Sequence, residues 1–195
     1  MKKIIVIVVI IAIAFFGYSW FKGKYNSMVG LNESSSSAWA QVENVYQRRA
    51  DLIPNLVNTV KGSANFEQET LTGVIEARAK ATQVKVDPSR LTPENIQAFQ
   101  AAQGQLSSAL GRLMVVVERY PEIKSTQAFR DLQVQLEGTE NRITVERQRF
   151  NEVIRGYNTY IKQLPNNFVA MIANFDAKGY FEAEAGSSEA PVVEF

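Results

Sequence analysis

A seven-residue repeat of apolar side chains in the second half of the chain restricts its fold more than any other feature. The repeat runs through six successive positions, which are Phe129, Leu136, Ile143, Phe150, Tyr157 and Leu164. Side chains seven residues apart fall on one face of an α-helix, so the repeat predicts a single long helix that packs against other helices. We expect this helix to begin after Ser125 as its N-cap and to end before Pro165.

Three earlier stretches have apolar residues at the same alternating spacing of three and four. They cover about residues 31–60, 66–84 and 92–120. Thr92 is placed to cap the last of these helices, with Pro93 at its first position. Asn65 and Gln68 form the pattern of a capping box at the start of the middle one. Because the links are short, the predicted fold is all-α: an antiparallel up-down four-helix bundle with long helices, preceded by an N-terminal transmembrane helix.

Pro54 falls inside the first of these three helices. Its ring cannot donate the backbone hydrogen bond that would reach the carbonyl of Ala50, which is therefore left free. Since the apolar spacing resumes at once after Pro54, we expect a kink in the helix rather than its end.

An uncharged apolar run occupies residues 4–21 near the amino terminus. As a helix it would be about 27 Å long, close to the roughly 30 Å thickness of the hydrocarbon core of a bilayer. The residues that we expect in the anchor include Ile4, Val8, Ile11, Phe15, Trp20 and Phe21. A signal peptide cleaved after the Ala-Ile-Ala sequence at 12–14 is the alternative. The apolar character continues past that site, which favours an uncleaved anchor.

Charge divides the chain into a basic start and a slightly acidic remainder. The first 24 residues contain four lysines and no acidic residue, although the whole chain has 21 Lys and Arg against 20 Asp and Glu. An acidic remainder argues against nucleic-acid binding, which relies on clustered basic side chains. We expect a membrane anchor at 1–24, a helical bundle at 25–182 and a flexible acidic tail at 183–195. The flanking lysines slightly favour an orientation with the amino terminus in the cytoplasm and the bundle outside it.

Histidine and cysteine are both absent from the chain. Their absence excludes disulfides, thiolate nucleophiles and Cys-ligated zinc, and also the usual triads and di-iron centres that need an imidazole. The sequence contains neither a glycine-rich phosphate-binding loop nor a calcium-binding loop. We therefore expect no metal ion, no cofactor and no small-molecule substrate.

Charged residues that interrupt the apolar stripes are the first candidates for a site. Arg49 is in line with core positions of the first bundle helix, and Glu146 occupies a core-facing position of the last. One interpretation is a buried Arg49–Glu146 pair that fixes the packing register. The other is that the Arg49 stem packs while its guanidinium reaches solvent.

Carboxylates are dense on the last helix. Glu137 and Glu140 are three residues apart and share a helix face. A solvated face interleaved with arginines is one reading of them. The alternative function is a hydrolase of envelope polymers that uses Glu137, Glu140 and Glu146 together with arginine.

Several short strings resemble signature segments of the bacterial LemA family. They include Arg-Arg-Ala-Asp-Leu-Ile-Pro-Asn-Leu at 48–56, Tyr-Pro at 120–121, Thr-Glu-Asn-Arg-Ile at 139–143 and Tyr-Asn at 157–158. The resemblance runs from about residue 25 to 181 and implies an N-terminal anchor, a helical bundle, and no established catalytic activity or cofactor. It also implies a link to membrane protein quality control, since some members are associated with that process beside a membrane zinc protease. With Glu146 added, the structural or interaction candidates are Arg48, Arg49, Asp51, Pro54, Asn55, Tyr120, Pro121, Thr139, Glu140, Asn141, Arg142, Glu146, Tyr157 and Asn158.

The sequence as a whole predicts a membrane-anchored scaffold or adaptor rather than an enzyme. Its expected partner is a membrane or envelope protein, with a membrane protease and a second copy of the chain among the candidates. The process that the resemblance implies is membrane protein quality control or the stress response. Val193 and Phe195 place apolar side chains in the pattern that PDZ domains read at a carboxyl terminus, and a plain flexible tail is the alternative.

Overall fold

The computed structural model describes residues 1–62 and 66–182. Within these residues the chain forms helices and no strand, which confirms the predicted all-helical class. The helices are α1 (Lys2–Lys61), α2 (Gln68–Gln83), α3 (Pro93–Val117), α4 (Pro121–Lys124), α5 (Gln127–Lys162) and α6 (Asn166–Ala173). The tail residues Val193 and Phe195 lie outside the described residues.

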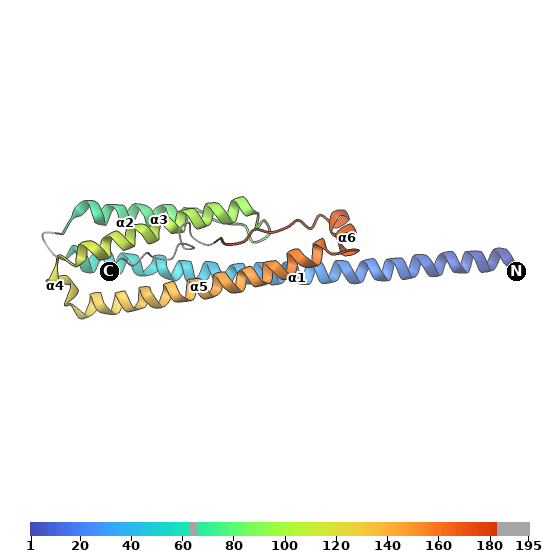
Figure 1. Cartoon of the computed structure of the whole chain (residues 1–195), viewed down its shortest axis with the longest axis horizontal. Helices are drawn as coiled ribbons and strands as arrows, with labels where there is room; N and C mark the ends of the chain where they lie inside the picture. The colour runs from blue at the N-terminus through green and yellow to red at the C-terminus, as the bar shows by residue number, and fades with distance from the viewer. Residues whose placement is uncertain (63–65, 183–195) are drawn as a thin grey trace, which may run out of the picture.

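The long helices lie side by side along one axis (Figure 1). α1 packs along α5, and α2 packs along α3, so the domain is built from two helical pairs. Each long helix runs opposite to the long helix before it in the chain. The start of α1 extends beyond the other helices as a single rod.

α1 is one uninterrupted helix of 60 residues, whereas the sequence pattern predicts a bundle helix that begins near residue 31. The helix continues through the four serines at 34–37, and the hydroxyls of Ser34, Ser35 and Ser36 bond to carbonyls within it. Ser34 and Ser35 each donate to the carbonyl four residues earlier at 2.9 Å. The apolar start of α1 and the helical domain are therefore joined without a loop.

Pro54 lies inside α1, which continues to Lys61 as expected. The carbonyl of Ala50, left free by the proline, accepts a hydrogen bond from Nε of Arg78 in α2 at 2.7 Å. The predicted local defect thus becomes a link between two helices, because a buried carbonyl is costly unless a donor reaches it.

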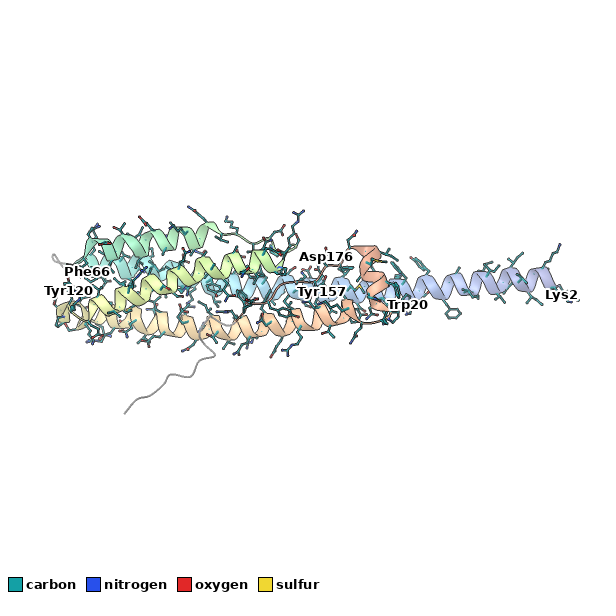
Figure 2. All side chains as sticks on the ribbon, turned by 45° about the horizontal axis from the view of Figure 1, so that its top comes forward. Lys2, Trp20, Phe66, Tyr120, Tyr157 and Asp176 are labelled. Carbon is teal, nitrogen blue, oxygen red and sulfur yellow. The ribbon has the colours of Figure 1, made fainter. Side chains whose placement is uncertain are left out.

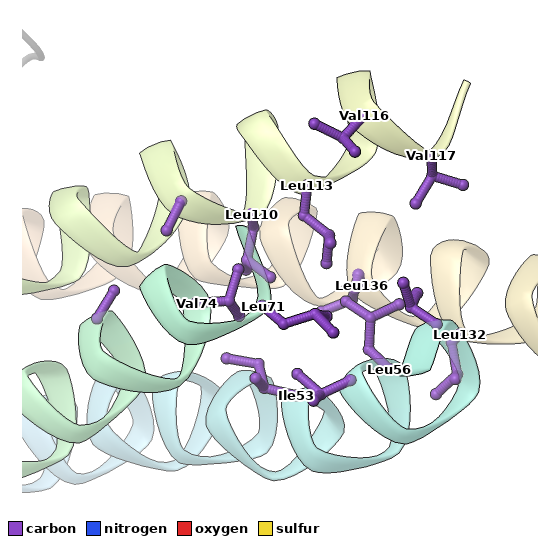
Figure 3. Packing of buried hydrophobic residues seen from close by; sticks show 14 of the residues in the cluster. Ile53, Leu56, Leu71, Val74, Leu110, Leu113, Val116, Val117, Leu132 and Leu136 are labelled. Carbon is purple, nitrogen blue, oxygen red and sulfur yellow. The ribbon is translucent and has the colours of Figure 1, made fainter. Parts of the chain in front are cut away.

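Three clusters of buried apolar side chains succeed one another along the domain. The distal cluster lies farthest from the amino terminus and contains residues from each of the helices α1, α2, α3, α4 and α5. It includes Leu56, Leu113 and Leu136 (Figure 3). The middle cluster contains Trp39, and the proximal cluster contains Met28. The first buried residue of α1 is Met28, after the apolar run at 4–21, and the last residue of that run, Phe21, packs against the proximal cluster.

The start of α5 differs from the prediction by one residue. Thr126 is the N-cap, and its hydroxyl accepts the N–H of Phe129 at 3.3 Å. Ser125 instead ends α4, a single helical turn that the sequence pattern did not separate from the connecting loop.

The start of α3 is confirmed. The Thr92 hydroxyl accepts the N–H of Asn95 at 3.3 Å, and Pro93 is the first helical residue. α2 begins at Gln68 with Glu67 as its N-cap, so the expected start at residue 66 after an Asn65 cap is wrong; Asn65 itself lies outside the described residues.

After α6 the chain returns along the domain. Asn174 ends α6 in the left-handed conformation, with φ of 56°. Residues 175–182, which we name the C-terminal strap, then run without helix or strand and contact both α3 and α5. The sequence pattern does not predict the strap.

Candidate functional site

Two polar arrangements lie inside the helical domain. The first surrounds Arg49 of α1, where the middle and distal clusters meet. The second holds the C-terminal strap against α3 and α5. In the part of the chain that the structure describes, no group of three or more acidic side chains is placed to hold a metal ion.

The Arg49 guanidinium contacts α3 and α5 from α1, and only 1% of the side chain is exposed. Nη1 donates to Oε1 of Glu140 at 2.7 Å and to Oγ of Ser107 at 2.8 Å. Nη2 donates to Oε1 of Gln103 at 2.7 Å and to the carbonyl of the same residue at 3.3 Å. The ring of Tyr46 lies 5.1 Å from the guanidinium carbon. We name Arg49, Gln103, Ser107 and Glu140 the Arg49 layer.

The Arg49 layer can stabilise the helix packing because its buried charge is paired and hydrogen-bonded. Burying a guanidinium is costly unless its N–H groups are bonded. Both terminal nitrogens of Arg49 are bonded, and the Glu140 side chain is 47% exposed, which keeps the desolvation of its carboxylate small. Nε of Arg49 has no hydrogen-bond partner among the described residues. Because a planar fork needs partners at fixed places, the layer favours one register of the helices.

Both sequence interpretations of Arg49 are wrong. Arg49 does not pair with Glu146, whose Oε1 accepts from Nη1 of Arg149 on the same helix at 2.8 Å. The guanidinium does not reach solvent either. Glu140 and Glu146 are six residues apart, so their side chains leave α5 in different directions and only Glu140 reaches Arg49.

Side-chain amides of α5 hold the strap through its backbone. Asn158 accepts the N–H of Lys178 and donates to the carbonyl of the same residue, both at 2.9 Å. Asn151, one heptad earlier, bonds Phe181 in the same way, at 2.9 and 2.8 Å. Each amide thus satisfies both backbone groups of one strap residue, as a neighbouring β-strand would.

The end of the strap is held from both sides. Gln100 of α3 accepts the N–H of Glu182 at 3.2 Å and donates to its carbonyl at 2.9 Å. Arg147 of α5 donates to the same carbonyl at 2.8 Å. The strap therefore fills the gap between α3 and α5 as an extended segment bound by side chains from both helices.

Two strap residues fix its position along the gap. Phe181 is buried in the middle cluster, where its ring stacks on Trp39 with 6.1 Å between centroids. The N–H of Gly179 donates to the carbonyl of Leu91 at 2.8 Å. A Cβ atom at Gly179 would lie 2.6 Å from Cα of Pro93, so the close approach requires glycine.

Lys178 buries its ammonium with no hydrogen-bond partner among the described residues. Its Nζ lies 5.2 Å from the centre of the Tyr157 ring, and burial lowers the pKa of Lys178. The Tyr157 hydroxyl donates to the carbonyl of Asp176 at 3.0 Å. Burial, followed by the negative charge of Asp176, raises the pKa of Tyr157 to about 12. The hydroxyl therefore stays protonated and remains a donor to the strap at neutral pH.

The gap between α3 and α5 continues beyond the strap toward the distal end. A hollow of about 750 Å³ lies there. We name it the distal groove, and its lining includes Ser107, Leu110, Gly111, Met114, Leu136, Glu137 and Glu140. A second hollow of about 700 Å³ lies beside the strap, and Ser107 of the Arg49 layer borders both. The strap and the distal groove are thus successive parts of one gap.

Most other candidates from the sequence lie outside these arrangements. Those exposed on the surface are Arg48, Asp51, Asn55, Asn141 and Arg142, of which Asn141 also lines the distal groove. Tyr120 packs its ring against Phe66 with 5.0 Å between centroids, at the turn where Pro121 begins α4. Thr139 is buried and donates to the carbonyl of Gln135 at 2.7 Å. The candidates that the two arrangements bring together are Arg49, Glu140, Tyr157 and Asn158.

Sequence reasoning missed most of the residues that bind Arg49 and the strap. Gln103 interrupts the apolar stripe of α3, which was an available signal of a buried polar contact. Asn151 and Asn158 are seven residues apart, so both amides leave one face of α5. Lys178 and Gly179 could not be identified from the sequence, because the strap has no periodic pattern of apolar and polar residues.

The expected anchor residues lie at the start of α1. Ile4, Val8, Ile11, Phe15 and Trp20 are exposed, whereas Phe21 is partly buried against the proximal cluster. Among the described residues, α1 is the helix that is long and apolar enough to cross a membrane, and none of its apolar window is buried.

Comparison with known proteins gives one family and several relatives. The model of the LemA family matches residues 38–195. Magnetosome protein MamQ 2 of Paramagnetospirillum magneticum is 28% identical over 187 residues, which cover 87% of this chain and 68% of the relative. Magnetosome protein MamQ of Magnetospirillum gryphiswaldense is 27% identical with the same coverage. Protein LemA of Metamycoplasma hominis is 22% identical over 178 residues, which cover 88% of this chain and 78% of the relative.

Proposed function

The chain belongs to the LemA family, and on this basis we propose that it is a membrane-anchored helical scaffold or adaptor of the bacterial cell envelope. In this proposal α1 spans the cell membrane through residues 4–21, with the amino terminus in the cytoplasm. The long helices form an antiparallel up-down bundle outside the cytoplasm and present a docking surface to an envelope protein. A membrane protease is the partner class to test first, in membrane protein quality control.

The proposed docking site is the distal groove, and its occupant is an extended segment of the partner. The strap is the observation that carries this proposal, because the same gap already holds an extended polypeptide beside the groove. Asn151, Asn158 and Gln100 bind that polypeptide through its backbone, which is common to all sequences. A gap that accepts one extended segment in this way is suited to accept a second one farther along.

The lining of the distal groove suggests the chemistry of the segment. Leu110 and Leu136 are buried, and Met114 beside them is half-buried and adapts to differently shaped apolar side chains. Glu137 and Glu140 add carboxylates to the lining, and Glu140 is about half exposed although it binds Arg49. Side chains alternate along an extended segment, so one that places apolar residues against the leucines and Lys or Arg against the carboxylates fits best.

Peptide binding by the full chain in nanodiscs tests the groove. Fluorescently labelled peptides that alternate Leu with Lys are compared with peptides that alternate Leu with Glu, by anisotropy. Gly111→Phe places a ring in the groove, and Gly138→Phe places the same ring elsewhere on the surface. A Cβ atom at either glycine meets no heavy atom within 4 Å, so both variants should fold.

We expect the Leu/Lys peptides to bind and Gly111→Phe to weaken that binding about tenfold, while Gly138→Phe leaves it unchanged. Equal affinity in all three proteins, or equal binding of Leu/Glu peptides, would contradict the docking site. The hydrolase alternative gains no support from the described residues, because Glu140 and Glu146 are paired with different arginines and point in different directions.

A further inference from the structure

α6 carries an apolar face that no part of the described chain covers. The face consists of Leu164, just before the helix, and Phe168, Met171 and Ile172, with exposed fractions of 75%, 55%, 71% and 65%. On the opposite side, Val169 and Ala170 are buried in the proximal cluster. A surface helix in water normally has a polar outer face, so an outer face of large apolar residues indicates contact with another apolar surface. We name these four residues the α6 apolar face.

α6 lies where the apolar run of α1 ends. Phe21 is the last residue of that run, and it packs against the proximal cluster that contains Val169. The ring of Tyr25 lies 5.8 Å from the ring of Phe175, just after α6. Figure 2 shows Trp20 beside α6. α6 is therefore level with the end of the segment that would cross a membrane.

The direction of α6 also fits a membrane surface. Both views show α6 crossing the direction of α1 at the end of the domain from which the rod extends (Figures 1 and 2). A helix that crosses a membrane-spanning helix at the level of the headgroups lies in the plane of the interface, where apolar side chains can be buried about 5–10 Å deep.

Basic residues surround this end of the domain. Lys22 and Lys24 directly follow the apolar run, and Lys24 places its Nζ 5.7 Å from the centre of the Tyr160 ring. Lys162 is exposed at the end of α5, two residues before Leu164. Lysines at this depth extend their ammonium groups toward anionic headgroups while their stems stay in apolar surroundings.

We propose that the α6 apolar face inserts into the interface of the bilayer that α1 spans, as a second contact of the domain with lipid. The inference rests on the proposed function in one respect, which is that α1 crosses a membrane. Because α1 continues into the domain without a loop, two contacts with the bilayer define both the tilt of the domain and its rotation about α1. The height and direction of the distal groove above the membrane are then fixed.

Single thiols can test the contact without background, because the chain contains no cysteine. The full chain carrying Phe168→Cys or Met171→Cys is labelled with nitrobenzoxadiazole and placed in liposomes of phosphatidylethanolamine and phosphatidylglycerol. Label emission is measured with and without lipids that carry a doxyl quencher near the headgroup. Tyr18→Cys in the apolar run is the positive control, and Val115→Cys, at a 72% exposed position near the end of α3, is the negative control.

We expect labels at 168 and 171 to be blue-shifted and quenched by the doxyl lipids, as at 18, while the label at 115 shows neither effect. Quenching at 18 without quenching at 168 and 171 would overturn the α6 contact and leave the anchor intact. A blue shift at 168 without lipid quenching would also overturn it, and would assign the face to a protein partner or a second copy. An unquenched label at 18 would contradict the anchor and with it both proposals.

Discussion

Arg49 and Lys178 are both buried cations, but the structure surrounds them differently. The Arg49 fork donates four hydrogen bonds of 2.7–3.3 Å and faces the carboxylate of Glu140. Lys178 has no hydrogen-bond partner among the described residues, and its charge lies 5.2 Å from the centre of the Tyr157 ring. Arg49 thus joins three helices through bonded contacts, whereas burial of Lys178 opposes the packing of the strap against the domain. The strap, which contains Lys178, should therefore be easier to displace from the domain than the Arg49 layer.

The largest effect in this comparison should come from Arg49→Ala. The change leaves Oε1 of the buried Gln103 without the donor that Arg49 supplies, and it should cost about 3 kcal/mol of unfolding free energy. Arg49→Lys should recover only part of this, because an ammonium cannot reach both α3 and α5. Chemical denaturation of the full chain in detergent, followed by circular dichroism, measures both. Arg48→Ala, at the exposed neighbouring position, is the control. Equal losses of unfolding free energy in the two alanine variants would show that the Arg49 layer does not stabilise the domain.

A smaller effect, about 2 kcal/mol, is expected for Asn158→Ala, which removes both backbone bonds to Lys178 and one to the Tyr180 hydroxyl. The loss should be confined to the strap, so amide hydrogen exchange should speed up at 178–182 and stay slow around Leu113 in the distal cluster. Asn141→Ala, at an exposed asparagine, should change neither. Faster exchange throughout the domain would show that strap and distal cluster are not independent.

Gly179→Ala should destabilise the strap by about 1–2 kcal/mol, because the new Cβ would sit 2.6 Å from Cα of Pro93. Gly138→Ala, at an open helical position, should instead stabilise the protein by about 0.5–1 kcal/mol. Thermal unfolding of the two variants beside the parent chain compares them directly. The same sign of change in both would mean that contact with α3 does not hold the strap.

Among the changes to Arg49 and the strap, Lys178→Met should give the smallest effect and the opposite sign, a gain of about 1 kcal/mol at pH 7, since it removes an unpaired buried charge. Burial lowers the pKa of Lys178 below 10.5 in the folded protein. Between that lowered pKa and pH 10.5 the unfolded chain binds more protons at Lys178 than the folded chain, so the stability of the parent protein rises with pH in this range. Tyr157, with its pKa raised from 10.0 to about 12, makes stability fall above pH 10. The methionine variant should show the fall without the rise. Denaturation at several alkaline pH values measures this, and a loss of stability at pH 7 would contradict it.

Local physics explains the parts of the fold that the sequence predicted. The heptads of α5, the Thr92 cap of α3 and the carbonyl freed by Pro54 each depend on residues a few positions apart. The length of α1 was missed because the apolar run at 4–21 and the apolar spacing from residue 31 were interpreted as separate elements, whereas one helix contains both.

The candidate site was less predictable because its contacts join distant segments. Arg49 stood out as a charge in an apolar stripe, but its partner depends on how α5 lies against α1, which the heptad position of Glu146 does not specify. The strap is bound through its backbone, so its own side chains carry little trace of the contact. Asn151 and Asn158, spaced by one heptad, were the available clue.

Site-specific photo-crosslinking in native membranes tests most directly whether the distal groove holds a partner. A photoreactive residue replaces either Met114, which lines the groove, or Val115, which is exposed beside it on α3. We predict a discrete crosslinked partner from position 114 that is absent from position 115 and lost in the Gly111→Phe variant. Equal crosslinking from both positions, or a product at 114 that survives Gly111→Phe, would contradict an adaptor that works through this groove.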